Sequence, residues 1–234
     1  MSTPRTDLAS LRIAIVGAES TGKSVLAQAL ADALAREFGL RCAVVDEYLR
    51  EWCDQHGRTP RDDEQMGIAL EHARRIDSAA ARPGLDVLRC DTTPLMVAIY
   101  SDLLFDDRSL EPVARACQQR MDITLLTALD LPWVADGLQR DGPHVREPVD
   151  ARVRARLNSW RTDWALVAGT GSERTDRAVD ALRPLLRARA ASAPRDSGLF
   201  SRLRESRNGP PGPAWICELC DDPACEHLAG PPPR

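Results

Sequence analysis

The chain has 234 residues, a formal net charge of −4 and seven cysteines. This length suffices for one buried α/β domain of about 200 residues with a small appendage, and the weak negative charge gives no support for nucleic-acid binding. No apolar run approaches the roughly 20 residues that cross a membrane, which argues against a membrane partner. Residues 1–10 form a short polar tail without a secretory segment, so we expect a cytoplasmic protein with reduced cysteines.

A phosphate-binding motif follows the first predicted strand. The apolar run at residues 11–16 leads into Gly-Ala-Glu-Ser-Thr-Gly-Lys-Ser at residues 17–24, which matches the phosphate-loop spacing. The glycines let backbone amides turn toward phosphate oxygens, Lys23 supplies positive charge, and the Ser24 hydroxyl is a ligand for Mg²⁺. The helix that follows, ended by Gly39, adds its positive dipole end. We therefore expect ATP to bind to Gly17, Ala18, Glu19, Ser20, Thr21, Gly22, Lys23, Ser24 and Val25.

Acidic residues end the next two predicted strands. The strand at 41–46 delivers Asp46 and Glu47, and the strand at 85–91 ends in Asp91. Ligands of open parallel sheets bind at the carboxyl ends of strands, so a carboxylate there can take the proton of an attacking hydroxyl. Either Asp46 or Glu47 fits this catalytic role, although acids also cap helix N-termini. Asp91 occupies the place of the acid that steadies Mg²⁺ in phosphate-loop enzymes.

The rest of the chain alternates predicted helices and strands. The strands lie at 122–129 and 164–168, and the helices at 60–81, before 104, 111–120, from about 150, and 172–191. Pro184 should kink or interrupt the last helix. The alternation predicts an α/β P-loop NTPase domain over residues 11–191, with a doubly wound, parallel, five-stranded sheet covered by helices on both faces.

A Gly-, Pro- and Arg-rich segment at residues 133–146 separates the fourth and fifth strands. A small-molecule kinase needs a mobile lid that excludes water and adds positive charge, and an arginine over the transferring phosphoryl group stabilises its charge. Arg140 and Arg146 suit that function. Solvated surface arginines are the alternative explanation in an arginine-rich chain. We predict a kinase-like lid with Arg140 as a catalytic residue.

Taken together, the motifs resemble the ribosylnicotinamide kinase domain of NadR-type NAD-salvage proteins. The resemblance implies transfer of the ATP γ-phosphate to the 5′-hydroxyl of nicotinamide riboside. It also implies acceptor binding by Glu47, Arg50, Trp133 and Asp136. The chain departs from the larger members of that family because only ten residues precede the first strand, so we expect it to lack their adenylyltransferase domain. The matching segments are residues 15–24, 46–51, 90–93 and 122–138, within a resemblance that spans about residues 11–186.

A second hypothesis comes from another class of protein. A regulatory P-loop ATPase would carry the same phosphate loop and would use the C-terminal tail to dock a partner. Nucleoside-dependent release of ADP would indicate the kinase, whereas nucleoside-independent hydrolysis would indicate the ATPase.

The C-terminal residues 215–234 follow a Pro/Gly-rich linker at 192–214 and contain a cluster of soft ligands. Their C-x2-C-x4-C-x-H spacing could close a tetrahedral Zn²⁺ site, which would staple a segment too short to fold unaided. A redox pair and incidental cysteines are the alternatives. We predict structural zinc and leave the protein partner of this tail undefined. The proposed ligands are Cys217, Cys220, Cys225 and His227.

Overall fold

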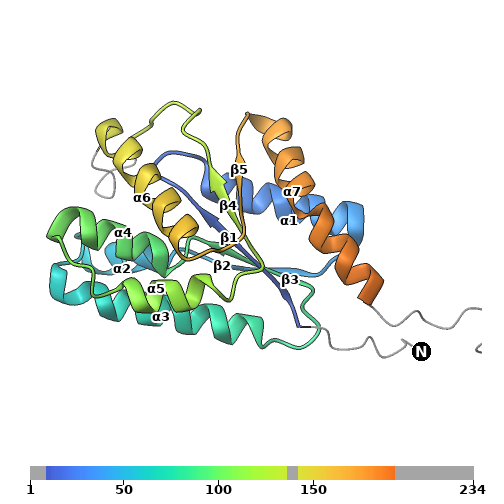
Figure 1. Cartoon of the computed structure of the whole chain (residues 1–234), viewed down its shortest axis with the longest axis horizontal. Helices are drawn as coiled ribbons and strands as arrows, with labels where there is room; N and C mark the ends of the chain where they lie inside the picture. Colours follow the sequence, from blue (N-terminus) through green and yellow to red (C-terminus); the bar gives the residue numbers. More distant parts are fainter. Residues whose placement is uncertain (1–8, 136–141, 193–234) are drawn as a thin grey trace, which may run out of the picture. The chain divides into compact units, whose positions relative to one another are not determined.

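The computed structural model describes residues 9–135 and 142–192. Within them, five strands form one parallel sheet in the order β2-β3-β1-β4-β5 (Figure 1). This order confirms the predicted doubly wound sheet, with β1 at its centre. The strands are β1 (Leu11–Val16), β2 (Cys42–Val45), β3 (Val87–Asp91), β4 (Ile123–Thr127) and β5 (Trp164–Val167).

Helices cover both faces of the sheet, as the sequence predicted. One face packs against α1 (Lys23–Phe38) and α7 (Gly171–Ser192), which lie together in Figure 1. The other face packs against the remaining helices. These are α2 (Tyr48–His56), α3 (Asp62–Ala80), α4 (Pro94–Phe105), α5 (Glu111–Gln118) and α6 (Arg146–Ser159), which a 3₁₀ turn at Pro143–Val145 precedes.

Strand β1 is apolar from Ile13 to Val16, whereas Arg12 near its start bonds to Asp77 of α3. Ile13 and Ile15 pack under α1 and α7, whereas Ala14 and Val16 face the opposite helical layer. All four side chains are completely buried. The part of a central strand that helices cover on both faces favours apolar side chains, and burial of each isoleucine contributes about 2 kcal/mol.

One helix begins earlier than the sequence predicted, and another is unbroken at its proline. Helix α6 begins at Arg146, four residues before its expected start. The sequence prediction missed this first turn because it begins with the polar residues Arg146 and Glu147, ahead of the apolar stripe of Val149, Val153 and Leu157. Helix α7 continues through Pro184 without a break. No helix within the described ranges is long and apolar enough to cross a bilayer.

His72 is a fully buried imidazole on α3, and neither ring nitrogen has a hydrogen-bond partner. Burial lowers its pKa to about 4, and the nearby charge of Arg75 acts in the same direction. The folded protein therefore binds fewer protons than the unfolded chain as the pH falls from 6.5 toward 4, so stability present at neutral pH is lost on acidification.

Because of His72, the parent protein should lose about 2 kcal/mol of unfolding free energy between pH 7 and pH 5. We expect the His72→Leu variant not to show this loss. Urea unfolding of parent and variant at both pH values measures this difference. His56→Leu is the matched control, because His56 is exposed and its ring nitrogen Nδ1 bonds to the Trp52 carbonyl. An identical pH dependence in parent and His72→Leu would contradict the assignment.

Candidate active site

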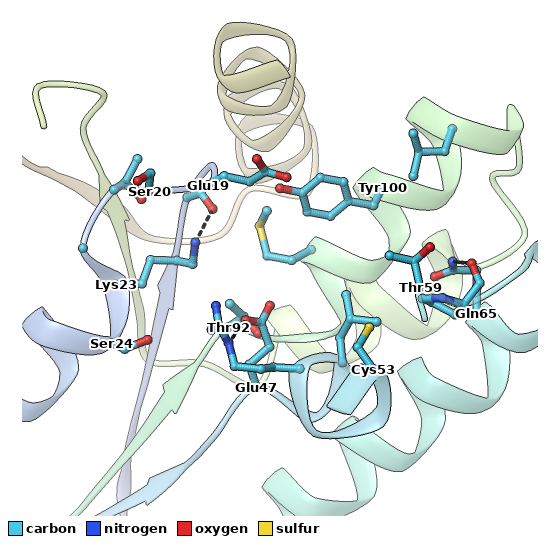
Figure 2. Close-up of a pocket in the computed structure, with 18 of the residues that line it drawn as sticks. Glu19, Ser20, Lys23, Ser24, Glu47, Cys53, Thr59, Gln65, Thr92 and Tyr100 are labelled. Atoms are coloured by element: carbon cyan, nitrogen blue, oxygen red, sulfur yellow. Dashed lines mark hydrogen bonds and ion pairs between the residues drawn. The ribbon is translucent and has the colours of Figure 1, made fainter. Parts of the chain in front are cut away.

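A cavity of about 430 Å³ opens at the carboxyl ends of β1, β2 and β3. Its volume lies in the range of small-molecule sites. Residues of the phosphate loop and the first turn of α1 line one end, and residues of α2, α3 and α4 line the other (Figure 2). The sequence predicted ligand binding at these strand ends, and the cavity agrees with that expectation.

The phosphate loop depends on glycine at two positions. Gly17 has a φ of 152° and Gly22 a φ of 73°, values that other residues rarely adopt. A Cβ atom on Gly17 would lie 2.1 Å from the Thr127 hydroxyl. That hydroxyl is 2.7 Å from the hydroxyl of Thr21, so β4 and the loop are joined by side chains behind the cavity. The close approach explains why Gly17 cannot carry a side chain.

The cationic end of the cavity fits a polyphosphate. Gly22 is the N-cap of α1 and makes no side-chain capping bond, and no acid lies in the first turn. The amides and dipole of this helix end are therefore available to an anion. The ammonium group of Lys23 donates to the carbonyls of Gly17 (3.1 Å) and Ala18 (2.9 Å) and lies across the loop (Figure 2). Lys23 is also the only lysine among 31 basic residues of the chain.

Arg174 anchors the phosphate loop from behind. Its guanidinium donates to the carbonyls of Thr21 (2.9 Å) and Gly169 (2.7 Å) and to the carboxylate of Asp130 (2.8 Å). Asp130 also accepts a bond from the amide of Gly169 (2.5 Å). The Arg174 side chain is only 6% exposed. Sequence analysis missed this residue, because an arginine on a polar helix face resembles any surface arginine.

We expect Arg174→Met to lower the unfolding free energy by about 3 kcal/mol and to raise the KM for ATP, because Asp130 and two carbonyls lose a buried donor. Denaturant unfolding and ATP titration measure the two effects. Arg177→Met on the same helix is the control, since its ion pair with Glu173 is about half exposed and should contribute under 1 kcal/mol. Equal effects of the two variants would contradict an anchoring role.

The structure separates the two acids that follow β2. Glu47 lines the cavity, and its side chain is 21% exposed, whereas Asp46 is exposed and lies outside the lining. Glu47 is the N-cap residue of α2, but its side chain makes no capping bond. Burial raises the pKa of Glu47, the charge of Lys23 opposes this, and the charge of Asp91 adds to it. The Glu47 carboxylate therefore lines the cavity and does not cap the helix.

The side chains of Asp91 and Ser24 offer oxygen atoms of the kind that Mg²⁺ prefers as ligands. Asp91 is buried at the end of β3, and its Oδ1 atom has no hydrogen-bond partner. Ser24 is exposed at the cavity wall. A buried carboxylate oxygen without a partner is the kind of group that a hard cation satisfies, so these residues fit Mg²⁺.

The second end of the cavity is mainly apolar. Met96, Tyr100 and Leu104 extend from α4 at a spacing of four residues, and Leu49 and Cys53 extend from α2. Arg50 also lines the cavity, with its guanidinium 3.8 Å from the Glu47 carboxylate. Thr59, Pro60, Gln65 and Phe105 complete this end. Sequence analysis named only Glu47 and Arg50 here, because helical spacing of apolar residues also describes an ordinary core.

The start of the predicted lid contacts the phosphate loop. The amide of Val134 donates to the Ser20 hydroxyl (2.7 Å), which lies 3.2 Å from the Val134 carbonyl. Trp133 does not line the cavity, and its indole nitrogen is buried without a hydrogen-bond partner in the described part of the chain. Asp136 and Arg140 lie outside the described residues.

Within residues 9–135 and 142–192, no group of three or more His, Cys, Asp or Glu side chains could hold a metal ion. Cys42, Cys53, Cys90 and Cys117 are free thiols. The predicted zinc ligands Cys217, Cys220, Cys225 and His227 lie outside the described residues.

A sequence model described as an AAA domain matches residues 12–174, which run from β1 to the anchoring arginine. The chain belongs to the AAA domain family. Membership agrees with the phosphate loop and the parallel sheet of this AAA domain. A comparison with curated proteins finds no match.

Solved structures confirm the fold. A NadR protein in complex with NR superposes with a TM-score of 0.62 at 20% identity, covering 75% of this chain and 51% of that chain. A NadR protein in complex with NAD and AMP-PNP superposes with a TM-score of 0.59 at 19% identity, covering 75% of this chain and 49% of that chain. Thymidylate kinase from Ehrlichia chaffeensis superposes with a TM-score of 0.55 at 14% identity, covering 75% of this chain and 99% of that chain. This AAA domain protein thus spans about half the length of the NadR chains.

Proposed function

We propose that this protein is an ATP-dependent kinase that phosphorylates the 5′-hydroxyl of a nucleoside, with nicotinamide riboside as the first candidate. One observation carries the proposal. The inward carboxylate of Glu47 and the ammonium group of Lys23 line the same cavity, one at the acceptor end and the other at the phosphate end (Figure 2). This is the arrangement that transfer of a phosphoryl group to a hydroxyl requires.

The residues divide the chemistry between them. The loop amides and Lys23 bind the β- and γ-phosphates, and Glu47 orients the acceptor hydroxyl and accepts its proton during attack. Arg50 holds the polar side of the acceptor beside Glu47. Mg²⁺, when bound by Ser24 and Asp91, supplies positive charge to the phosphates. Lid residues, Arg140 among them, exclude water and add positive charge.

The charge of the cavity favours a nucleoside over a nucleotide acceptor. Its lining contains two acids, Glu19 and Glu47, and two bases, Lys23 and Arg50. Lys23 is assigned to ATP, and Arg50 is already near the carboxylate of Glu47. The described lining therefore offers no cluster of arginines for an acceptor that carries its own phosphate. The NadR structure in complex with NR supports nicotinamide riboside as the first acceptor to test.

A panel of acceptors with the full-length protein tests the proposal. Purified protein with ATP and Mg²⁺ is incubated with nicotinamide riboside, with the common nucleosides and with nucleoside monophosphates. ADP release and the mass of the product are then measured. Release that requires a nucleoside, with a product heavier by one phosphoryl group, is the expected result. Hydrolysis that is unchanged by every acceptor would indicate the regulatory ATPase instead.

A further inference from the structure

Thr92 follows Asp91 on the floor of the cavity and has an unusual backbone conformation. Its φ is 67°, in the left-handed region that β-branched residues rarely adopt. Four described non-glycine residues have a positive φ. Asp106 and Arg161 lie at the ends of α4 and α6, where this conformation is common. Only Ser20 and Thr92 line the cavity.

The sharp connection between β3 and α4 causes this conformation. The amide of Thr92 donates to the carbonyl of Ile15 (3.0 Å), which keeps the residue in line with the sheet. Thr93 is extended, as the residue before a proline must be, and Pro94 begins α4. Thr92 is therefore the one residue of this connection that adopts the left-handed conformation.

The consequence is that the Thr92 side chain turns toward Glu47. Thr92 is 2% exposed, and Figure 2 shows it beside Glu47 in the cavity that both residues line. Burial raises the pKa of Glu47, and hydrogen bonding to the Thr92 side chain is among the influences that oppose this rise. Glycine or asparagine would suit the backbone better. A threonine in this conformation indicates that its hydroxyl is needed at this position.

We propose that Thr92 is a positioning residue, whose hydroxyl holds the carboxylate of Glu47 in the orientation in which it meets the acceptor hydroxyl. This inference rests on the proposed function, because it assumes that Glu47 contacts the acceptor. Thr92 acts through Glu47 and takes no proton itself. A misdirected carboxylate loses rate even when it is still present, because proton transfer requires hydrogen-bond distance to the acceptor.

Paired substitutions test the inference. Thr92→Val removes the hydroxyl and keeps the shape, and we expect it to lower kcat for the acceptor about tenfold or more with little change in the KM for ATP. Thr92→Ser keeps the hydroxyl and should restore kcat to within about threefold of the parent. Thr92→Gly suits the backbone without a hydroxyl and should lose as much rate as Thr92→Val while remaining folded.

A double-mutant cycle separates positioning from general packing. If Thr92 acts through Glu47, then adding Thr92→Val to Glu47→Gln should lower kcat by less than about twofold further. Thr93→Val is the control. Thr93 is equally buried, and its hydroxyl bonds to Gln118 (2.8 Å), outside the cavity. It should lower the melting temperature but leave kcat unchanged.

The outcomes distinguish this inference from the proposed function. Full activity in Thr92→Val and Thr92→Gly, or an undiminished loss on the Glu47→Gln background, would overturn the positioning role while leaving the kinase assignment intact. Full turnover in Glu47→Gln would overturn both the positioning role of Thr92 and the role of Glu47 in the proposed kinase reaction.

Discussion

Replacement of Lys23 by alanine is expected to lower nucleoside-dependent phosphoryl transfer by about a thousandfold while leaving the protein folded. Lys23 is the only lysine in the sequence, and it lies across the loop that is assigned to the phosphates. The charge that develops on the transferring phosphoryl group loses its closest cation, and removal of one such charge donor commonly costs a hundred- to a thousandfold. Initial rates at saturating ATP and thermal unfolding measure the two properties.

The same residue allows a second measurement that does not depend on turnover. An amine-reactive reagent can modify only Lys23 and the N-terminal amine, because the chain has no other lysine. We expect ATP to protect Lys23 from modification, as detected by peptide mass spectrometry. Lys23→Arg is a useful companion variant, since a planar guanidinium keeps the charge but not the compact shape of an ammonium group. Labelling that ATP does not affect, or retained turnover in Lys23→Ala, would contradict the assignment.

The second large effect is expected for Glu47→Gln. This substitution keeps the size of the side chain and removes the base, so we expect kcat to fall about a hundred- to a thousandfold. The affinity for ATP should change by less than about threefold, because the phosphates bind at the other end of the cavity. Isothermal titration with a non-hydrolysable ATP analogue, beside steady-state kinetics, separates the two quantities.

Asp46→Asn is the matched control for Glu47→Gln. Asp46 is the adjacent acid, but it is exposed and lies outside the cavity, so its variant should keep parental kcat. The pH profile gives a further check. Burial raises the pKa of Glu47 above its ordinary 4.5, so activity that needs the ionised form should fall as the pH drops through a value above 4.5. Glu47→Gln should lose this acid limb. Equal effects of the two substitutions would indicate that neither acid is the base.

Predictions that depend on neighbouring residues in the sequence agree best with the structure. The residues from Gly17 to Ser24 combine glycines that permit positive φ, a cation and a hydroxyl within one turn, and the structure places them as the spacing predicted. The boundaries of β1 were predicted correctly, because the part of this strand that is buried on both faces forms a continuous apolar run. Helix α6 was predicted to begin four residues late, since a polar first turn leaves no periodic signal.

The choice between Asp46 and Glu47 as the proposed base cannot be made from local sequence patterns. Asp46 and Glu47 are adjacent acids that follow the same strand, and the sequence does not distinguish them. Beyond Val45 the regular alternation of side chains ends, so the direction of each carboxylate depends on how the chain enters α2. Only the packing of α2 against α3 and the sheet directs Glu47 inward.

The sequence by itself determined that this chain carries a phosphate loop in a parallel α/β sheet, because both depend on residues that are close together in the chain. Only the tertiary structure decided the lining of the apolar end of the cavity, the anchoring of the loop by Arg174 and the proximity of Thr92 to Glu47. The physical reason is separation along the chain. Arg174 bonds to Thr21 across 153 residues, and no sequence period records which distant segments fold to the same sheet edge.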